Sequence, residues 1–310
     1  MLQFRKYHGL GNDFVLVDAR RTGALDLGRD TISRICDRRF GVGADGLIVV
    51  LPPQRDGDLR MRIFNADASE PEMCGNGIRC LARFIADLDD APAGSCWRVE
   101  TLAGVISPEL LEDGQVRVDM GEPCLSPETV PTTLAAGRDR AIDQPLLVDG
   151  ELLRVSAIGM GNPHAVVPVP DLETFDVEGL GAVLERHPAF PARTNAGFVQ
   201  VLAPDRLRLR VWERGAGPTL ACGTGACAAL VAAHLLGLCR REATVELPGG
   251  PLLIAWGDDN RLGMTGPARC VFTAQLDTRQ LEAAPAGAAM GSRQPVPATA
   301  AVTPAAPDHS

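Results

Sequence analysis

The chain has 310 residues, of which 45% are hydrophobic and 22% charged, as in globular proteins with a full hydrophobic core. The formal net charge of −9 gives no electrostatic reason to expect nucleic acid or an anionic membrane surface as a partner. No apolar run is long enough to cross a bilayer, and the first residues do not resemble a secretory signal. We therefore expect a cytoplasmic protein.

The predicted elements are mostly short strands, interrupted by Gly, Pro and Asp, with a few helices among them. In chain order, strands are expected over 14–17, 47–50, 59–64, 116–120, 165–169, 197–202 and 207–212. Helices are expected over 29–36, 75–88, 180–186 and 223–238. This mixture predicts an α+β fold with sheets wrapped around buried helices. Residues 281–310 are rich in Ala and Pro and are expected to form a disordered tail.

An internal repeat is the most informative feature of the sequence. The segment LRMRIF at 59–64 resembles LRLRVW at 207–212. Ten residues after the aromatic residue that ends each segment comes a CGxG motif, which begins at Cys74 in the first copy and at Cys222 in the second. An apolar, alanine-containing helix is predicted after each motif. Because the two copies align without a gap, the two halves are expected to contain the same strand–loop–helix unit.

A second pair of motifs lies upstream in each half, with GLGN at 9–12 and GMGN at 159–162. Two repeated motifs in the same order favour a duplicated chain, which folds as two similar lobes around a pseudo-two-fold axis. We expect an N-terminal lobe over 1–121, completed by a return strand at about 265–276, and a C-terminal lobe over 122–264. Equivalent positions of the two lobes then face each other.

The two CGxG motifs place Cys74 and Cys222 where a loop enters a helix. The first N–H groups of a helix have no partner within the helix and form an anion site, which suits a carboxylate. The same position lowers the pKa of a cysteine. Two such thiols on opposite sides of a substrate fit the inversion of a stereocentre, because one removes a proton while the other delivers one to the opposite face. Helix N–H groups aimed at the carboxylate would stabilise the charge that develops.

Other functions for the thiol pair remain open at this stage. Two close thiols also suit a dithiol redox protein or an amino-acid-binding protein, although neither motif is a CxxC. The companions Cys80 and Cys227 lie within predicted helices and are interpreted as packing residues. No closely spaced Cys/His quartet predicts a metal. A pyridoxal-phosphate enzyme needs a lysine, and the only one, Lys6, stands near the N-terminus. We expect neither cofactor nor metal.

The motifs together resemble the diaminopimelate epimerase family, over about residues 3–276. They are KYHGLGNDF at 6–14, GVGADG at 41–46, FNAD at 64–67, CGNG at 74–77, GNPH at 161–164, and WERGAG at 212–217 leading to ACGTG at 221–225. In proline racemases and hydroxyproline epimerases a histidine usually follows the first CG, where this chain has Asn76. The resemblance implies two mixed sheets, each around a central helix. It also implies interconversion of LL- and meso-2,6-diaminopimelate in lysine biosynthesis, and a homodimer.

The resemblance also implies roles for individual residues, with Cys74 and Cys222 as the catalytic pair. The substrate-binding residues by the family pattern are Asn12, Asn65, Gly75, Asn76, Asn162, Asn195, Glu213, Arg214, Gly223 and Thr224. His164 and Glu213 are expected to tune the thiol pKa values, since a nearby imidazolium favours the thiolate and a nearby carboxylate favours the thiol. Some members have a substrate-binding glutamine where this chain has Gly46, so that role is not assigned. A related epimerase of another amino acid remains the alternative.

Overall fold

The structure is a computed structural model that describes residues 1–22, 25, 27–135 and 137–281. Of the expected disordered tail, residues 282–310 lie outside this described part. Leu281 is buried, and its carbonyl oxygen accepts a hydrogen bond of 2.9 Å from Arg34 Nη1. None of the described helices is long and apolar enough to cross a membrane.

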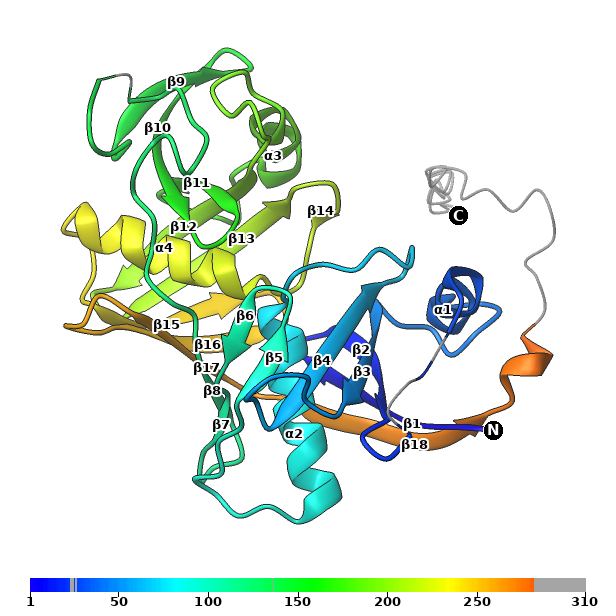
Figure 1. The fold of residues 1–310 in the computed structure, drawn as a ribbon. Helices are drawn as coiled ribbons and strands as arrows, with labels where there is room; N and C mark the ends of the chain where they lie inside the picture. The colour runs from blue at the N-terminus through cyan, green and yellow to red at the C-terminus, as the bar shows by residue number, and fades with distance from the viewer. Residues whose placement is uncertain (23–24, 26, 136, 282–310) are drawn as a thin grey trace, which may run out of the picture.

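The described chain forms two mixed sheets and four α-helices, arranged as two lobes (Figure 1). The first sheet has the order β18 (Arg269–Leu276), β1 (Leu2–Gly9), β2 (Asn12–Asp18), β3 (Gly46–Leu51), β4 (Leu59–Asn65), β5 (Val99–Thr101) and β6 (Gly104–Ile106). The second has the order β7 (Glu109–Leu110), β8 (Val116–Asp119), β17 (Leu262–Gly266), β16 (Gly250–Trp256), β15 (Glu242–Leu247), β13 (Arg206–Glu213), β12 (Asn195–Ala203), β11 (Pro163–Pro168), β10 (Glu151–Gly159) and β9 (Gln144–Val148), with β14 (Gly217–Pro218) beside β13.

The helices are α1 (Arg29–Cys36), α2 (Gly75–Asp89), α3 (Val177–Glu185) and α4 (Gly223–Leu235), followed by the 3₁₀ turn η1 (Thr278–Gln280). All four predicted helices are therefore present, and the predicted α+β class is confirmed. Helix α4 ends earlier than expected because Gly237 adopts a φ of 73°, and Leu238 N–H donates to the Ala233 carbonyl. This left-handed closure satisfies the last carbonyls and turns the chain away.

The two sheets repeat one pattern of strand pairing, which confirms the pseudo-symmetric fold inferred from the internal repeat. From β1 to β6 the neighbouring pairs alternate antiparallel, parallel, antiparallel, parallel, antiparallel. The series β10, β11, β12, β13, β15, β16 shows the same alternation. Helices α1 and α3 occupy equivalent connections, and so do α2 and α4. Since parallel neighbours need a crossover connection, these helices lie where the parallel pairs require them.

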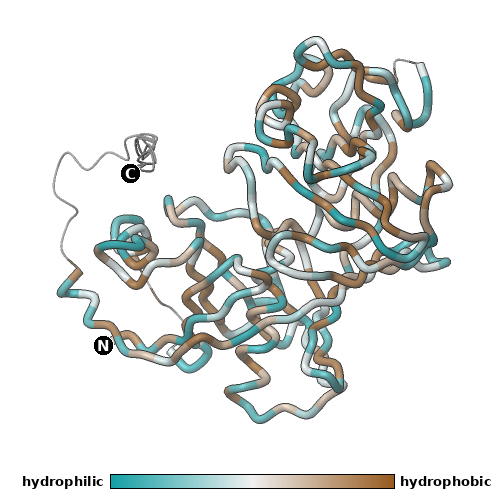
Figure 2. The backbone as a smooth tube through the Cα atoms, turned by 180° about the vertical axis from the view of Figure 1, so that it is seen from behind, coloured by the Kyte–Doolittle hydropathy of each residue, from teal (hydrophilic) through white to brown (hydrophobic). Residues whose placement is uncertain are grey.

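Helices α2 and α4 are the centres of the two lobes and meet each other where the lobes join. Every residue of α4 from Gly225 to Ala233 is buried, as expected for a helix that is apolar on all sides. Helix α2 is amphipathic and turns Arg83 and Asp87 toward the surface. In Figure 2 the apolar segments follow the strands of both sheets, and the hydrophilic ones gather at the peripheral turns.

Strand pairing divides the chain at different residues from the predicted lobe boundary at 121. Strands β7 and β8 pair with the second sheet through β17, although they also pack against α2 of the first lobe. Strand β18 pairs along its length with β1 of the first sheet. By pairing, the chain enters the second sheet between β6 and β7 and returns between β17 and β18. Residues 265 and 266 accordingly belong to β17 of the second sheet.

Candidate active site

The two cysteines of the repeat occupy the same place at the start of their helices. Cys74 is the N-cap of α2, with φ −137° and ψ 119°, and Cys222 is the N-cap of α4, with φ −130° and ψ 104°. The N–H of Gly77 donates to Cys74 Sγ at 3.5 Å. A Cβ on Gly225 would lie 3.1 Å from Cys222 Sγ, so a glycine in this turn leaves room for the sulfur. Both thiols therefore lie at helix N-termini.

The two helix N-termini face each other across the junction of the lobes. A Cβ added to Gly223 would lie 3.9 Å from the Cα atom of Gly75. The same added atom would lie 2.8 Å from Met264 Sδ, and one on Gly75 would lie 3.2 Å from Met264 Cε. Met264 thus packs against both helix starts. Because two positive helix ends converge here, the junction favours a bound anion such as a carboxylate.

Asn12 and Asn76 link the first lobe to the second at this junction. The Asn76 amide group donates to Asn12 Oδ1 at 3.1 Å and to the carbonyl oxygen of Ala221 at 3.2 Å. The Cys74 thiol donates to the same Asn12 oxygen at 3.8 Å. Asn12 Nδ2 donates in turn to Asp45 Oδ2 at 2.8 Å. The network fixes the residue before Cys222 to the first turn of α2.

The surroundings of the Cys222 thiol include an acidic residue, Glu213, and two threonines. Glu213, at the end of β13, is the carboxylate whose charge acts on Cys222. Glu213 Oε1 also accepts a hydrogen bond of 2.5 Å from Thr219 Oγ1. Thr224 Oγ1 lies 3.7 Å from Cys222 Sγ. The surroundings of the two thiols therefore differ, despite the shared helix-start geometry.

The GNPH motif and Arg214 form a second cluster, on the side of the C-terminal lobe. His164 Nε2 lies 2.9 Å from Asn162 Oδ1, and since an amide oxygen only accepts, Nε2 carries the hydrogen. Asn195 is buried beside it on β12, where its Nδ2 donates to the carbonyl of Pro163 at 3.0 Å. Its Oδ1 accepts from the backbone N–H of Arg214 at 2.9 Å. Asn195 thus holds the segment that carries Arg214.

Asn65 is the predicted site residue that these clusters do not include. It is exposed at the end of β4, and its Nδ2 donates to Ser69 Oγ at 2.9 Å. In the repeat it corresponds to Glu213, since each follows the aromatic residue that ends the repeated strand. In the strand register Asn65 pairs with Gly46, which takes the place equivalent to Asn195.

Burial governs the thiol pKa values in this structure. Burial raises the pKa of Cys74, and hydrogen bonds from the backbone N–H groups of Gly77 and Asn76 offset part of that rise. Burial and the charge of Glu213 raise the pKa of Cys222 well above its usual value. The expectation that helix starts lower both pKa values is therefore wrong for this conformation, because loss of hydration outweighs the helix contribution.

The predicted imidazolium at His164 also needs correction. Burial, aided by the positive charge of Arg214, lowers the pKa of His164 to about 3. The ring is therefore neutral near pH 7 and supplies no positive charge to a thiolate. Its Nδ1 is buried without a hydrogen-bond partner among the described residues. The charge of Glu213 raises the pKa of Cys222 and of Cys74, the direction expected for a carboxylate near a thiol.

Three residues at the site were not singled out from the sequence. Asp45 accepts a hydrogen bond from the Asn12 amide, and the Thr219 hydroxyl donates one to Glu213. Arg79 lies fully buried on α2 and contacts its first turn. Asp45 stands inside a motif that the resemblance uses, and Arg79 is the second residue after CGNG, but neither position indicated the contacts that these side chains make.

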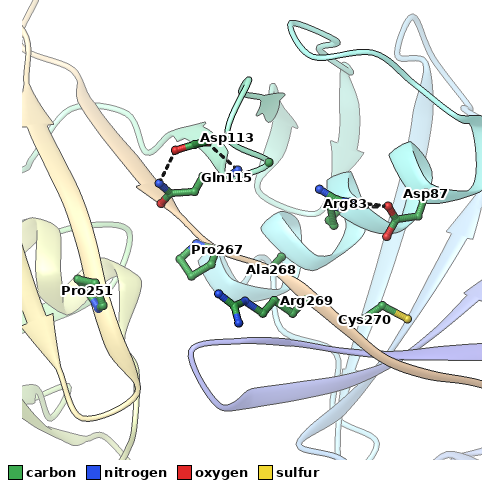
Figure 3. A pocket seen from close by; sticks show the side chains of 10 residues that line it. Arg83, Asp87, Asp113, Gln115, Pro251, Pro267, Ala268, Arg269 and Cys270 are labelled. Carbon is green, nitrogen blue, oxygen red and sulfur yellow. Dashed lines mark hydrogen bonds and ion pairs between the residues drawn. The ribbon is translucent and has the colours of Figure 1, made fainter.

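A large open cavity lies away from the thiols. Its volume is about 670 Å³, and α2, the β7–β8 turn and the start of β18 surround it (Figure 3). Its lining residues are Arg83, Asp87, Asp113, Gly114, Gln115, Pro251, Pro267, Ala268, Arg269 and Cys270. None of the predicted site residues is among them, so this cavity is not the candidate active site.

Comparison with known proteins gives the family. A sequence model of diaminopimelate epimerase matches residues 4–125 and 156–271, more than half of the chain. The chain belongs to the diaminopimelate epimerase family. The diaminopimelate epimerase of Synechocystis sp. is 56% identical over 277 residues, covering 89% of this chain and 99% of that protein. The diaminopimelate epimerase of Acaryochloris marina is 54% identical over 280 residues, with the same coverage of both chains.

Solved structures of low sequence identity share the fold. A probable proline racemase from Agrobacterium radiobacter, with bound carbonate, has a TM-score of 0.64 at 14% identity and covers 89% of this chain and 93% of its own. A hydroxyproline epimerase from Agrobacterium vitis, with bound trans-4-hydroxy-L-proline, has a TM-score of 0.63 at 15% identity and covers 88% of this chain and 91% of its own. At such low identity the likeness concerns the two-lobed fold alone.

Proposed function

We propose that the protein is a diaminopimelate epimerase, an isomerase that interconverts LL- and meso-2,6-diaminopimelate in lysine biosynthesis. The observation that carries the proposal is the contact between the starts of α2 and α4, each capped by a cysteine. Membership of the family supports the choice of substrate.

In the proposed reaction, Cys74 and Cys222 act on opposite faces of one α-carbon. One thiolate removes the α-proton, and the other thiol delivers a proton from the opposite side, which inverts the centre. After one turnover the thiol and thiolate have exchanged roles, and the reverse reaction follows the same path. Because burial raises both thiol pKa values in the free protein, the cationic ammonium group of the substrate is expected to assist formation of the thiolate.

The two helix starts are proposed to hold the reacting carboxylate. The backbone N–H groups of Gly75, Asn76, Gly223 and Thr224 lie in the first turns of α2 and α4, where helices leave N–H groups free for an anion. As the proton leaves, negative charge moves onto the carboxylate, and fixed N–H donors stabilise it. This binding also positions the α-carbon between the sulfurs.

The other end of diaminopimelate is proposed to bind the second cluster and to select the reacting stereocentre. Arg214 suits the distal carboxylate, because a guanidinium forms paired hydrogen bonds with a carboxylate. The amide oxygens of Asn12, Asn65, Asn162 and Asn195 suit an ammonium group. Asn195 is already bonded to Pro163 and Arg214, so it supports the cluster whether or not it touches the substrate.

The assignment is tested by incubating the fully reduced protein with LL-diaminopimelate and separating the stereoisomers by chiral chromatography. We expect meso-diaminopimelate to accumulate to equilibrium. Cys74→Ala and Cys222→Ala should each lower the rate by at least about 100-fold, since each removes one acid–base group. Failure of the reduced wild-type protein to convert LL-diaminopimelate would refute the proposal.

Two other functions are distinguished by the same preparation. Racemisation of L-proline or epimerisation of hydroxyproline, with no action on diaminopimelate, would indicate a related epimerase. Turnover of glutathione disulfide would indicate a dithiol redox protein. The raised pKa of Cys222 argues against the redox function, because efficient thiol–disulfide exchange needs an accessible thiolate.

We further propose that the protein is a cytoplasmic homodimer. Its two lobes are proposed to move relative to each other about residues 107–108 and 267–268, where the chain passes from one sheet to the other. All nine cysteines are free, which suits a reducing compartment. Strand β18 is an edge strand with exposed Val271 and Phe272, a feature that native proteins usually cover. Size-exclusion chromatography with light scattering should give twice the chain mass of 32.8 kDa.

A further inference from the structure

Arg79 is the largest fully buried side chain among the described residues. It lies on α2, one turn after the N-cap, in a slot between β1 and β17. A Cβ on Gly9 would lie 2.9 Å from Arg79 Nη2, and one on Gly266 would lie 3.4 Å from Nε. Larger residues at these two positions would close the slot. The guanidinium is therefore held at the junction of the two lobes.

The guanidinium is bonded to neutral groups alone. It donates to the Gly75 carbonyl at 3.2 Å, to Asn76 Oδ1 at 3.0 Å, to the Pro267 carbonyl at 3.4 Å and to Met264 Sδ at 3.6 Å. Among the described residues no carboxylate forms an ion pair with it. Burial lowers the pKa of Arg79, but a guanidinium stays charged at neutral pH. Burial of a cation without a counter-ion costs free energy of folding. Because no nearby anion neutralises it, the positive charge of Arg79 acts on the groups around it.

The titratable groups that face Arg79 are thiols. They belong to Cys74 and Cys80 on α2 and to Cys227 on α4. Burial raises the pKa of each of these thiols, and the charge of Arg79 counteracts that rise. Glu213 on β13 is the anionic group that acts on Cys74 in the opposite direction.

Arg79 breaks the pseudo-symmetry of the site. It is the fifth residue after Cys74, and the fifth residue after Cys222 is Cys227. The cation is thus bonded to the first turn of α2, while the first turn of α4 has no such cation among the described residues. The two thiols have equivalent backbone positions and both experience the charge of Glu213, but only Cys74 also experiences the opposing charge of Arg79.

We propose that Arg79 is a positioning residue, which fixes Asn76 at the α2–α4 contact and, by its unpaired charge, makes Cys74 rather than Cys222 the first thiol to ionise. The assignment of a role in turnover rests on the proposed epimerase function. Arg79 occupies Asn76 Oδ1, and this leaves the amide nitrogen of Asn76 to donate to Asn12 and to Ala221. Without Arg79 the Asn76 amide loses the partner that defines its orientation.

The test compares three variants in the full-length protein. Arg79→Met removes the charge and keeps much of the volume, and Arg79→Lys keeps the charge but loses the forked donor geometry. Arg83→Met is the matched control, since Arg83 lies one turn further along α2 and is paired with Asp87. Alkylation by iodoacetamide is measured across a pH series, and peptide mass spectrometry resolves Cys74 from Cys222. Initial epimerisation rates are measured in parallel.

In the wild type and in Arg83→Met, Cys74 should be alkylated at lower pH than Cys222. In Arg79→Met the alkylation midpoint of Cys74 should move to higher pH, toward that of Cys222, and kcat should fall about 10- to 100-fold with little change in KM. Arg79→Lys should keep the order of alkylation, with a lower kcat because Asn76 is less well held.

Earlier alkylation of Cys222 in the wild type, or an unchanged order in Arg79→Met, would overturn the proposal. If Arg79→Met does not fold, as judged by circular dichroism, Arg79→Lys decides: a reversed order or an unchanged kcat overturns it. The alkylation readout needs no turnover. A wild type that fails to epimerise diaminopimelate would therefore refute the proposed function while leaving the order of ionisation measurable.

Discussion

At the scale of single residues, the site combines two equivalent thiols with unequal neighbours. The repeat in the sequence was sufficient to predict that Cys74 and Cys222 cap two helices that meet. It did not predict their pKa values, because burial depends on how the two lobes close over the sulfurs. The same reason explains His164, whose motif suggested a charged ring and whose surroundings keep it neutral. Local sequence specifies the type of a group, and packing sets its ionisation.

Replacement of Glu213 tests the acidic half of this asymmetry. Burial and the Glu213 charge together raise the pKa of Cys222, so Glu213→Gln should move alkylation of Cys222 to lower pH. The epimerisation rate should fall about 10-fold or more, because the thiol that must donate a proton loses its carboxylate partner. Glu173→Gln, at an exposed position, is the control. An unchanged midpoint for Cys222 would show that Glu213 does not act on its charge.

Asp13 tests an ion-pair network beside the site. Burial raises the pKa of this carboxyl, but Arg38 and Lys6 outweigh burial and lower it to about 2 from 3.8. Their nitrogens lie 2.7 and 2.8 Å from its oxygens. A lowered folded-state pKa stabilises the fold above the unfolded value, and this contribution is lost as pH falls through about 2.

Asp13→Asn should therefore lower the free energy of unfolding by about 2 kcal/mol at pH 7. The difference from the wild type should shrink as the pH falls from 4 toward 2, which urea unfolding at several pH values measures. Asp258→Asn, on the exposed β16–β17 turn, controls for the loss of a charge alone. A difference that stays constant with pH would contradict the account.

At the scale of elements, alternation and turn residues were sufficient to predict all four helices and seven of the eighteen described strands, besides the return strand. A return strand was expected to complete the first lobe, but no local pattern specified β1, at the opposite end of the described chain, as the partner of β18. Strands β7 and β8 were assigned to the first lobe because they precede the boundary in sequence. Strand β8 pairs with β17, more than 140 residues later, and β7 pairs with β8, so pairing overrides order along the chain.

Gly249 tests how the loop that carries Asn12 is supported. A Cβ at this position would lie 1.9 Å from the carbonyl oxygen of Leu10, a backbone atom that cannot move without its loop. Gly249→Ala should therefore lower the free energy of unfolding by about 2–3 kcal/mol and slow epimerisation. In the control Gly263→Ala the new atom meets nothing closer than 3.9 Å, and stability should change by less than about 0.5 kcal/mol. Equal stability of the two variants in urea unfolding would refute this packing argument.

At the scale of the whole molecule, the chain passes from one sheet to the other at two places, and the thiols lie where α2 and α4 meet at the junction of the lobes. A substrate must reach Cys222, which is buried in this conformation, and Cys74, which is half-buried. Motion of one lobe relative to the other is the simplest way to admit it and then exclude water. Pseudo-symmetry supports this view, because each lobe has its own sheet around its own central helix.

Small-angle X-ray scattering measures that motion. The radius of gyration of the free protein should exceed that of the complex with α-methyl-diaminopimelate, which lacks the proton that the thiols remove. Closure reduces the distance between the lobe centres and so lowers this radius. Superimposable scattering curves with and without the saturating analogue would show that the lobes do not close, and entry would then need a local opening.

The proposed mechanism has one thiol on each face of the reacting α-carbon. The test is the early reaction of LL-diaminopimelate in heavy water. If one thiol is the base and the other the acid, deuterium appears at the inverted centre of the meso product and almost none appears in the recovered LL substrate. The proton removed by one sulfur cannot return to the other face, which receives a deuteron from the second sulfur. Deuterium at equal levels in recovered substrate and product would mean that a single base serves both faces, and would contradict the account.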